Sequence, residues 1–326
     1  MTNYSLRPFQ ASELEYIALA SLLHAVSTNG RPETVEDLRR EDNDWPSSSL
    51  LQRVAAYTSS EEMAAVGTCF QAYWQDNPST IYLKFDIHPD HPQVHLLPIL
   101  FGGLHRLLAE HTYEFRRMIA RVREDDRDRV RFLVENGFRE EMRSPASALR
   151  VADFEESVCD EAHARLAQSK VRIITLAELR DEEPDWKRKL RDLRWEIVRD
   201  VPSTEPFAKP TVAEFEEMVL RDPALDEEAF FIAQADDGAL IGMSNLWRND
   251  PEGKRLDTGL TGVIRSYRRK GIATALKVQT ILYAQTRGAD RIETSNEEDS
   301  PMYTLNLTLG FKPKPAWVDY AREASA

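Results

Sequence analysis

Cysteine is scarce in this chain, and histidine is missing from its second half. Only Cys69 and Cys159 occur among 326 residues, and their separation matches no metal-binding or redox motif. All seven histidines lie at or before His163. A Cys–His nucleophile or a histidine-rich metal site is therefore excluded from the later half, where a general base has to be a carboxylate, a water relay or a rarer group. We expect two free thiols and no metal.

The sequence also lacks a long hydrophobic run. The most apolar stretch, residues 94–104, is short and contains Pro98, so we predict no membrane-spanning helix. The N-terminus shows no basic segment followed by an apolar run, which is the pattern of a secretory signal. These absences, with the free thiols, predict a cytoplasmic protein without a membrane partner.

Positive charge is in deficit overall. The chain has 42 Lys and Arg against 55 Asp and Glu, for a formal net charge of −13. This balance argues against a nucleic-acid partner, because phosphate backbones need clustered cations, and it weakly favours a cationic substrate. A hydrophobic content of 42% is that of globular proteins, and the length favours two domains. Nothing in these quantities fixes an oligomeric state.

The same order of predicted elements occurs twice. A short strand at residues 4–8 and another at 171–176 are each followed by a helical pattern, and both halves end with a helix running into Gly137-Phe138 or Gly310-Phe311. The two Gly-Phe pairs are 173 residues apart. A repeat of this length indicates a duplicated domain rather than a solenoid.

The boundary between the copies is predicted in an acidic, alanine-rich stretch. We expect a first domain at residues 1–152, a linker at 153–170 and a second domain at 171–326. The later copy gives the clearer pattern, and its elements predict an α/β domain with a mixed sheet. Helices are expected at 185–199, 211–220, 271–286 and 301–309, and strands at 171–176, 229–235, 240–247, 256–264, 291–294 and 317–320.

A basic loop with one glycine follows the strand at 256–264. Arg268, Arg269 and Lys270 precede Gly271, where a helix is expected to begin, and Ala273 keeps the first turn small. The first N–H groups of a helix lack partners within it, and the helix dipole is positive there. This arrangement is typical of a pyrophosphate-binding site, although a solvated basic turn has the same composition.

Two motifs in this half resemble those of the GNAT superfamily of acyl-CoA N-acyltransferases. Arg268-x-x-Gly271-x-Ala273 is similar to the acetyl-CoA loop of that superfamily, Gln/Arg-x-x-Gly-x-Gly/Ala. Thr294-Glu-Asn296, followed by the segment 301–311 (PMYTLNLTLGF), is similar to a second motif. The resemblance implies two tandem GNAT-like α/β domains, each with a mixed, mostly antiparallel central sheet flanked by helices.

The resemblance further implies acetyl-CoA as co-substrate and an amine as acceptor. In the superfamily the sheet opens after the strand that precedes the loop, and pantetheine enters the gap like a substitute strand. Residues 268–273 would hold the pyrophosphate. The residues that the resemblance assigns to acetyl-CoA are Val263, Arg265, Arg268, Arg269, Lys270, Gly271, Ile272, Ala273, Thr274, Asn296 and Asn306.

The acid and base are less well marked. Asp257 lies eleven residues before Arg268, where histone-acetylating members carry a glutamate base, but a carboxylate exposed at a strand end is an equally simple interpretation. Many members carry a tyrosine that protonates the CoA thiolate at the position of Asn306. Tyr303 lies one turn earlier on the same helix and is the alternative acid, with packing or cofactor contact as the simpler role.

The first half departs from the superfamily pattern. With an offset of 176 residues, Pro92, His95 and Leu97 occupy the positions of the loop's arginine, glycine and alanine. The first domain therefore resembles a degenerate copy that has lost acetyl-CoA. His88, His91 and His95 match no standard zinc spacing, so we favour solvated histidines or contacts to substrate.

These observations predict an N-acetyltransferase in which an amine attacks the thioester directly. The alternative functions are a non-catalytic acyl-CoA sensor, favoured by Asn306 at the acid position, and a scaffold built on the first domain. Trp247, on the strand before the cofactor strand, is either an aromatic wall for a cationic acceptor or part of the core. The acceptor itself is not specified by any residue pattern.

Overall fold

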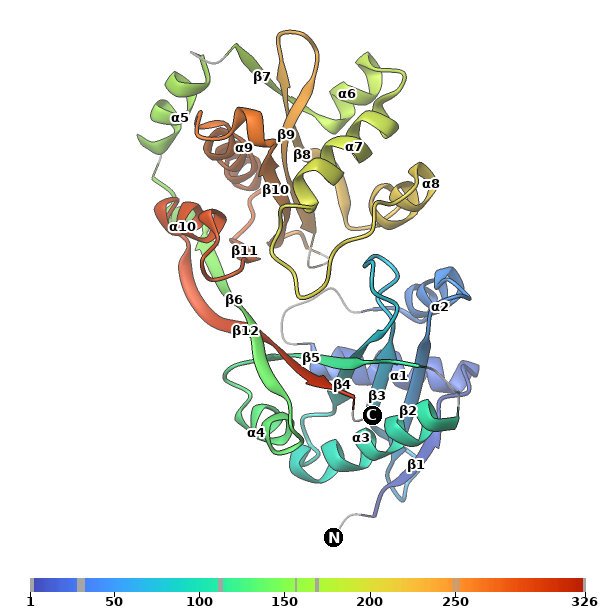
Figure 1. Ribbon diagram of the computed structural model, residues 1–326. Helices are drawn as coiled ribbons and strands as arrows, with labels where there is room; N and C mark the ends of the chain where they lie inside the picture. The colour runs from blue at the N-terminus through green and yellow to red at the C-terminus, as the bar shows by residue number, and fades with distance from the viewer. Residues whose placement is uncertain are drawn as a thin grey trace. The chain divides into compact units, whose positions relative to one another are not determined.

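The computed structural model describes residues 3–27, 33–110, 114–155, 157–167, 170–248, 250 and 252–324. It divides into two compact units (Figure 1). The N-terminal unit consists of Met1–Arg143, Thr204–Pro206 and Pro315–Ala326, and the C-terminal unit consists of Ser144–Ser203 and Phe207–Lys314. Within the described ranges, no helix has the length and apolarity needed to cross a bilayer.

The N-terminal unit is built on a sheet of order β1-β2-β3-β4-β5-β12. Its neighbours are antiparallel except β4 and β5, which are parallel. Leucines of α3 pack on one face of the sheet, and residues of α1 pack on the other. The strands are β1 (Ser5–Pro8), β2 (Leu51–Tyr57), β3 (Met63–Phe70), β4 (Thr80–Ile87), β5 (Arg117–Arg123) and β12 (Lys312–Glu323). The helices are α1 (Glu13–Val26), α2 (Val35–Asp44), α3 (Gln93–Glu110) and α4 (Arg127–Glu135).

The C-terminal unit repeats this design with the order β6-β11-β10-β9-β8-β7, in which only β10 and β11 are parallel. Helices α5 and α9 cover one face of the sheet, and α6 and α7 cover the other. The strands are β6 (Arg139–Arg150), β7 (Val171–Thr175), β8 (Leu225–Ala235), β9 (Leu240–Arg248), β10 (Arg255–Val263) and β11 (Arg291–Ser295). The helical segments are η1 (Val151–Asp153), α5 (Ser157–Ala167), α6 (Leu176–Glu182), α7 (Trp186–Val198), α8 (Val212–Phe215), η2 (Glu216–Leu220), η3 (Arg265–Tyr267), α9 (Ile272–Thr286) and α10 (Pro301–Thr308).

The predicted repeat is visible in the local structure. Gly137 and Gly310 both adopt positive φ, 82° and 91°, directly after α4 and α10. This conformation ends a helix and is open to glycine without steric penalty. The phenylalanines that follow, Phe138 and Phe311, are both buried in the core of a unit. The tandem α/β architecture predicted from the sequence is therefore confirmed.

The compact units do not coincide with the predicted boundaries at 1–152, 153–170 and 171–326. Residues 146–150 of β6 pair with β11 in the C-terminal unit, whereas residues 317–323 of β12 pair with β5 in the N-terminal unit. Figure 1 shows the red C-terminal strand beside β5. The N-terminal sheet thus contains the strand that follows Gly310-Phe311, and the C-terminal sheet contains the strand that follows Gly137-Phe138. A sequence repeat does not reveal this exchange, because it gives the order of the strands and not the sheet that each strand joins.

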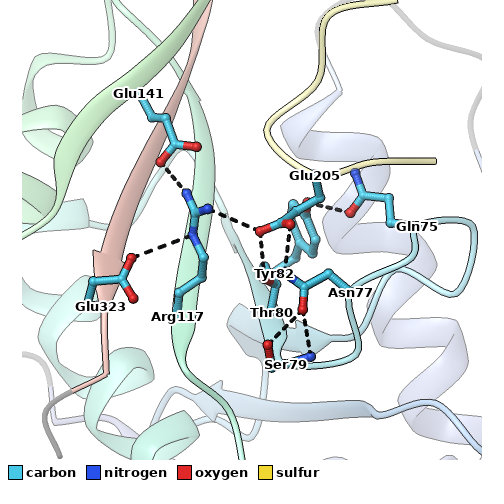
Figure 2. A network of polar contacts seen from close by, with 9 residues as sticks. All are labelled: Gln75, Asn77, Ser79, Thr80, Tyr82, Arg117, Glu141, Glu205 and Glu323. Atoms are coloured by element: carbon cyan, nitrogen blue, oxygen red, sulfur yellow. Dashed lines mark hydrogen bonds and ion pairs between the residues drawn. The ribbon is translucent and has the colours of Figure 1, made fainter. Parts of the chain in front are cut away.

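The segment Thr204–Pro206, which connects α7 to α8 in sequence, also belongs to the N-terminal unit. Figure 2 shows the network that holds it. The buried Glu205 accepts hydrogen bonds from Asn77 Nδ2 (2.7 Å), Thr80 Oγ1 (2.8 Å) and Arg117 (3.1 Å). Arg117 also forms an ion pair with Glu141. Since a buried carboxylate needs such compensation, Glu205 fixes this segment to β4 and β5.

Candidate functional site

The sheet of the C-terminal unit opens between its two parallel strands. Pairing of β10 with β11 extends from Arg255 opposite Arg291 only to Asp257 opposite Glu293. Beyond Asp257, β10 remains paired with β9 as far as Val263, and β11 remains paired with β6. The edge of β10 from Thr258 to Val263 therefore carries peptide groups that β11 does not bind. We call the region between this edge and β11 the strand opening.

A bulge in β10 lies beside the strand opening. Its register with β9 shifts between Thr258 and Thr261. The backbone N–H of Leu260 is bound instead by the side-chain Oδ1 of Asn245, at 2.9 Å. A Cβ on Gly259 would lie 2.4 Å from the indole nitrogen of Trp247, so only glycine allows this close packing. The bulge bends β10 and is a local reason for the parting of the strands.

Two carboxylates meet on the face of the sheet that α7 covers. Leu256 and Ile292 point into the core beneath α9, so their neighbours Asp257 and Glu293 point to the opposite face. The two are register partners in the parallel pair. Trp247, the partner of Asp257 on β9, packs in the cluster beneath α7. The predicted base Asp257 thus lies beside an aromatic side chain and a second carboxylate.

Glu293 was not recognised in the sequence, although it is as well placed as Asp257. Its carboxylate binds Lys314 Nζ at 2.8 Å and Arg291 Nε at 2.9 Å. The usable signal was the alternation along residues 291–295, which places residue 293 opposite the buried Ile292. The register with β10 that joins it to Asp257 required the tertiary structure.

The predicted anion loop has the expected backbone. Gly271 precedes α9 with φ 78° and offers no side chain to cap the helix, so the first N–H groups of α9 remain available. Ala273 and Thr274 are half-buried in the first turn, whereas the side chain of Ile272 is buried in the core. Only the backbone of Ile272 is therefore placed for a ligand. Arg269 also adopts a positive φ, 63°, which is strained for a residue with a side chain.

An acidic residue that the motif does not contain balances the charge of this loop. Asp200, just after α7, binds Arg265 at 2.5 Å and Arg268 at 2.5 Å. These two guanidinium groups, with Arg265 contributing most, lower the pKa of Asp200 to about 2. Arg268 also donates from Nε to the carbonyl of Val263 at 2.9 Å, which ties the loop to the end of β10. Lys270 lies over the ring of Tyr267 at 4.7 Å.

The second predicted motif forms an amide pair at the end of β11. Asn306, on α10, is buried and donates from Nδ2 to Oδ1 of Asn296 at 2.6 Å. Within the described structure, Oδ1 of Asn306 is buried without a hydrogen-bond partner. An unsatisfied buried acceptor is costly, so this oxygen is suited to a ligand donor. Tyr303 is half-buried one turn before Asn306 on α10.

The N-terminal unit has the opening but not the loop. Pairing of β4 with β5 ends at Leu83 opposite Ala120, although β4 continues to Ile87. Of the histidines that follow, His91 faces Tyr4 Oη at 3.1 Å and His88 accepts from the N–H of Asp90 at 3.3 Å. Among described residues, no three His, Cys, Asp or Glu side chains are grouped so as to hold a metal ion.

Two cavities in the described part of the C-terminal unit do not identify the site by themselves. The larger, about 720 Å³, lies between α5, β7 and the turn after β8, away from every predicted site residue. The smaller, about 430 Å³, is lined by α7, the same turn and Ile264, which directly follows β10. The strand opening is the candidate site, because the β10 edge that β11 does not bind, the start of α9 and the unsatisfied amide of Asn306 all border it.

Residues 188–307, from α7 to α10, match the model of the acetyltransferase (GNAT) family. This segment contains the strand opening, the loop and the amide pair. This segment matches a GNAT-type acyltransferase domain. A search of curated protein sequences found no match.

Solved structures show that the tandem GNAT fold extends over the whole chain. A tandem GNAT protein from the clavulanic acid biosynthesis pathway has a TM-score of 0.73 at 18% identity, over 99% of both chains. A GCN5-related N-acetyltransferase from Sphaerobacter thermophilus has a TM-score of 0.67 at 17% identity, over 98% of this chain and 95% of that one. N-myristoyltransferase from Saccharomyces cerevisiae, solved with myristoyl-CoA, has a TM-score of 0.61 at 10% identity, over 100% and 80%. The GNAT domain and the fold support an acyl-CoA-dependent N-acyltransferase.

Proposed function

We propose that this chain is a cytoplasmic, acetyl-CoA-dependent N-acetyltransferase, with its active site at the strand opening of the C-terminal unit. The observation that carries the proposal is the convergence of the unpaired β10 edge with the start of α9 at Gly271. A strand edge binds amides by backbone hydrogen bonds, and a helix start binds phosphate. Pantetheine and pyrophosphate are such groups, and they are linked in acetyl-CoA.

The residues of the strand opening have distinct roles in this proposal. Backbone groups of β10 up to Val263 and Arg265 bind pantetheine, and the backbone at Ile272, Ala273 and Thr274 binds the pyrophosphate. Arg268, Arg269 and Lys270 supply positive charge. Asp200 orients Arg265 and Arg268 by binding both guanidinium groups. Asn296 and Asn306 close the site at the end of β11, where Asn306 Oδ1 accepts a hydrogen bond from the ligand.

Proton transfer from the acceptor takes place on the α7 face of the sheet. Acetyl-CoA supplies the activated acyl group, and an amine attacks its carbonyl carbon directly. Asp257 takes the proton of the attacking nitrogen, directly or through a water, with Glu293 beside it. Strand N–H groups stabilise the oxyanion. The indole of Trp247 favours a cationic amine next to these carboxylates.

Substitution of Gly271 by glutamate tests the anion site. The new side chain opposes positive φ and places a negative charge where the pyrophosphate binds, so acetyl-CoA affinity should fall about 100-fold or more. The matched control is Gly238→Glu, because Gly238 has a similar φ, 81°, in the turn after β8. Titration calorimetry measures both. Wild-type protein that does not bind acetyl-CoA, or equal losses in both variants, would contradict the proposal.

Turnover separates catalysis from simple binding. A thiol-release assay with polyamines, aminoglycosides, amino acids and peptides should detect at least one acceptor, and Asp257→Asn should lower kcat about 10²- to 10⁴-fold with little change in acetyl-CoA affinity. Tight binding without turnover over this range of amines would favour the acyl-CoA sensor instead. Tyr303→Phe tests the remaining candidate acid in the same assay.

A further inference from the structure

One buried titratable group of the C-terminal unit is not used by the proposed reaction. Lys277, on α9, is only 1% exposed. Its ammonium makes one hydrogen bond, to Thr258 Oγ1 at 3.2 Å, and lies 4.9 Å from the centre of the Phe311 ring. In the described part of the chain it forms no ion pair. A buried amine with three donors and one acceptor is costly, and such a group needs a function or a ligand to explain it.

The position of Lys277 connects it to the strand opening. Thr258 is the first residue of β10 beyond the last pair with β11. Its side chain points to the α9 face, opposite to its neighbour Asp257. The ammonium of Lys277 therefore lies at the closed end of the opening, on the face away from the two carboxylates. An attacking amine on one face and a cation on the other face would enclose a thioester between them.

Burial is the cause that lowers the pKa of Lys277, to about 7. On the elements packed against α9, Asp226 on β8 accepts from Tyr283 at 2.5 Å, Glu293 on β11 binds two cations and Asp153 on η1 pairs with Arg150. Asp160 on α5 and Glu228 on β8 are exposed to solvent. Asp257 on β10 points to the other face of the sheet. The amine and ammonium forms of Lys277 are thus both populated near neutral pH, which suits a group that donates and recovers a proton.

We propose that Lys277 protonates the CoA thiolate as it leaves. This inference rests on the proposed function. The acceptor nitrogen forms a bond to the acyl carbon, the carbon–sulfur bond breaks, and its electron pair stays on sulfur. The sulfur then takes a proton from the ammonium of Lys277. The proton released by the acceptor nitrogen passes to Asp257 or water, and Lys277 recovers a proton from solvent after CoA leaves.

The acid strengths are suited to this transfer. An ordinary thiol has a pKa of about 8.5, so the proton moves favourably from an ammonium of lower pKa to a thiolate. Before transfer, the cation attracts the charge that develops on sulfur. Asn306 cannot perform this step, because an amide is not an acid near neutral pH.

The test compares Lys277→Met with Lys312→Met, which removes an exposed lysine at the start of β12. The thiol pKa of CoA bound to each protein is followed by the ultraviolet absorbance of the thiolate. At about pH 7, CoA bound to wild type or to Lys312→Met should have a thiolate fraction about threefold or more larger than CoA bound to Lys277→Met, because only these two proteins hold an ammonium near sulfur before Lys277 loses its own proton. Equal thiolate absorbance in all three proteins across the titration would overturn the proposal.

Kinetics supply the second readout. Lys277→Met should lower kcat about 10²- to 10⁴-fold with a small change in the KM for acetyl-CoA. In wild type, kcat should fall above neutral pH as the Lys277 ammonium loses its proton, and this fall should be absent in Lys277→Met. Its midpoint in urea should be equal or higher, because an apolar side chain replaces a buried amine. A structural lysine would give the reverse result, a lower midpoint with an unchanged pH profile.

A second variant keeps the test independent of folding. Thr258→Val retains the shape of Thr258 but removes the acceptor of the Lys277 ammonium, so the fall in rate should move to lower pH. An unchanged profile in this variant would count against Lys277. If wild type binds no CoA, the proposed function fails with it; if CoA binds and the thiolate absorbance is the same in every variant, only the role of Lys277 fails.

Discussion

Single residues around the anion loop set its charge more closely than the motif suggests. Arg265 and Arg268 are the cations nearest to β10, but both are bound to Asp200. Asp200 therefore removes one charge from the cluster while holding two guanidinium groups in place. Arg265 is largely exposed, whereas Asp200 is not, so solvent screens only part of this interaction.

Asp200 gives the protein a pH-dependent contribution to stability. Its pKa falls to about 2 in the folded chain, so the contribution is present above the ordinary value of 3.8 and disappears as pH falls from 3.8 towards 2. Asp200→Asn should lower the free energy of unfolding at pH 7 by about 1 kcal/mol after allowance for screening. Urea unfolding at several pH values measures this. The exposed Asp236→Asn should show no comparable loss; a pH-independent difference for Asp200→Asn would contradict this origin.

At the scale of elements, the segment Thr204–Pro206 is held by one buried carboxylate. Glu205→Gln removes the charge that Arg117 and Thr80 of β4 compensate. We therefore expect the free energy of unfolding to fall by about 1–3 kcal/mol. Glu323→Gln is the control, since Glu323 is 78% exposed and lies 4.0 Å from Arg117. Its cost should be within about 0.5 kcal/mol. Urea unfolding and proteolysis of the segment distinguish the two, and equal costs would show that Glu205 is not its anchor.

Element prediction succeeded where periodicity and end signals agreed. Ser12 caps the helix that follows the first predicted strand, and Thr211 caps the start of the helix expected at 211–220. Helix α6 was missed, although Thr175 and Glu178 form a capping box, because the preceding strand ends at Thr175 itself. Strand β12 was predicted only at 317–320 but spans Lys312–Glu323. Prolines in its first half obscured it, since proline is unfavourable within most strands.

At the scale of the whole molecule, strand exchange makes each unit depend on a distant part of the chain. Truncation after Lys314 removes the residues of β12 that pair with β5 (Arg117–Arg123), about 200 residues earlier in the chain. Amides of β5 should then exchange with solvent at least about tenfold faster, while amides of β10 stay protected, because β12 neighbours β5 but not β10. Hydrogen exchange by mass spectrometry measures both. Unchanged protection of β5 would contradict the exchange.

Local periodicity, glycine positions and the expected start of one helix were enough to predict the fold class, the duplication and the place of the proposed anion loop. Tertiary structure decided which strand completes each sheet, since that pairing joins residues far apart in the sequence. It also placed Asp200 beside the arginines of the loop. At the strand opening it placed Glu293 beside Asp257 and Lys277 against Thr258. Such neighbours lie far apart in the sequence and meet only through packing, so no local pattern contains them.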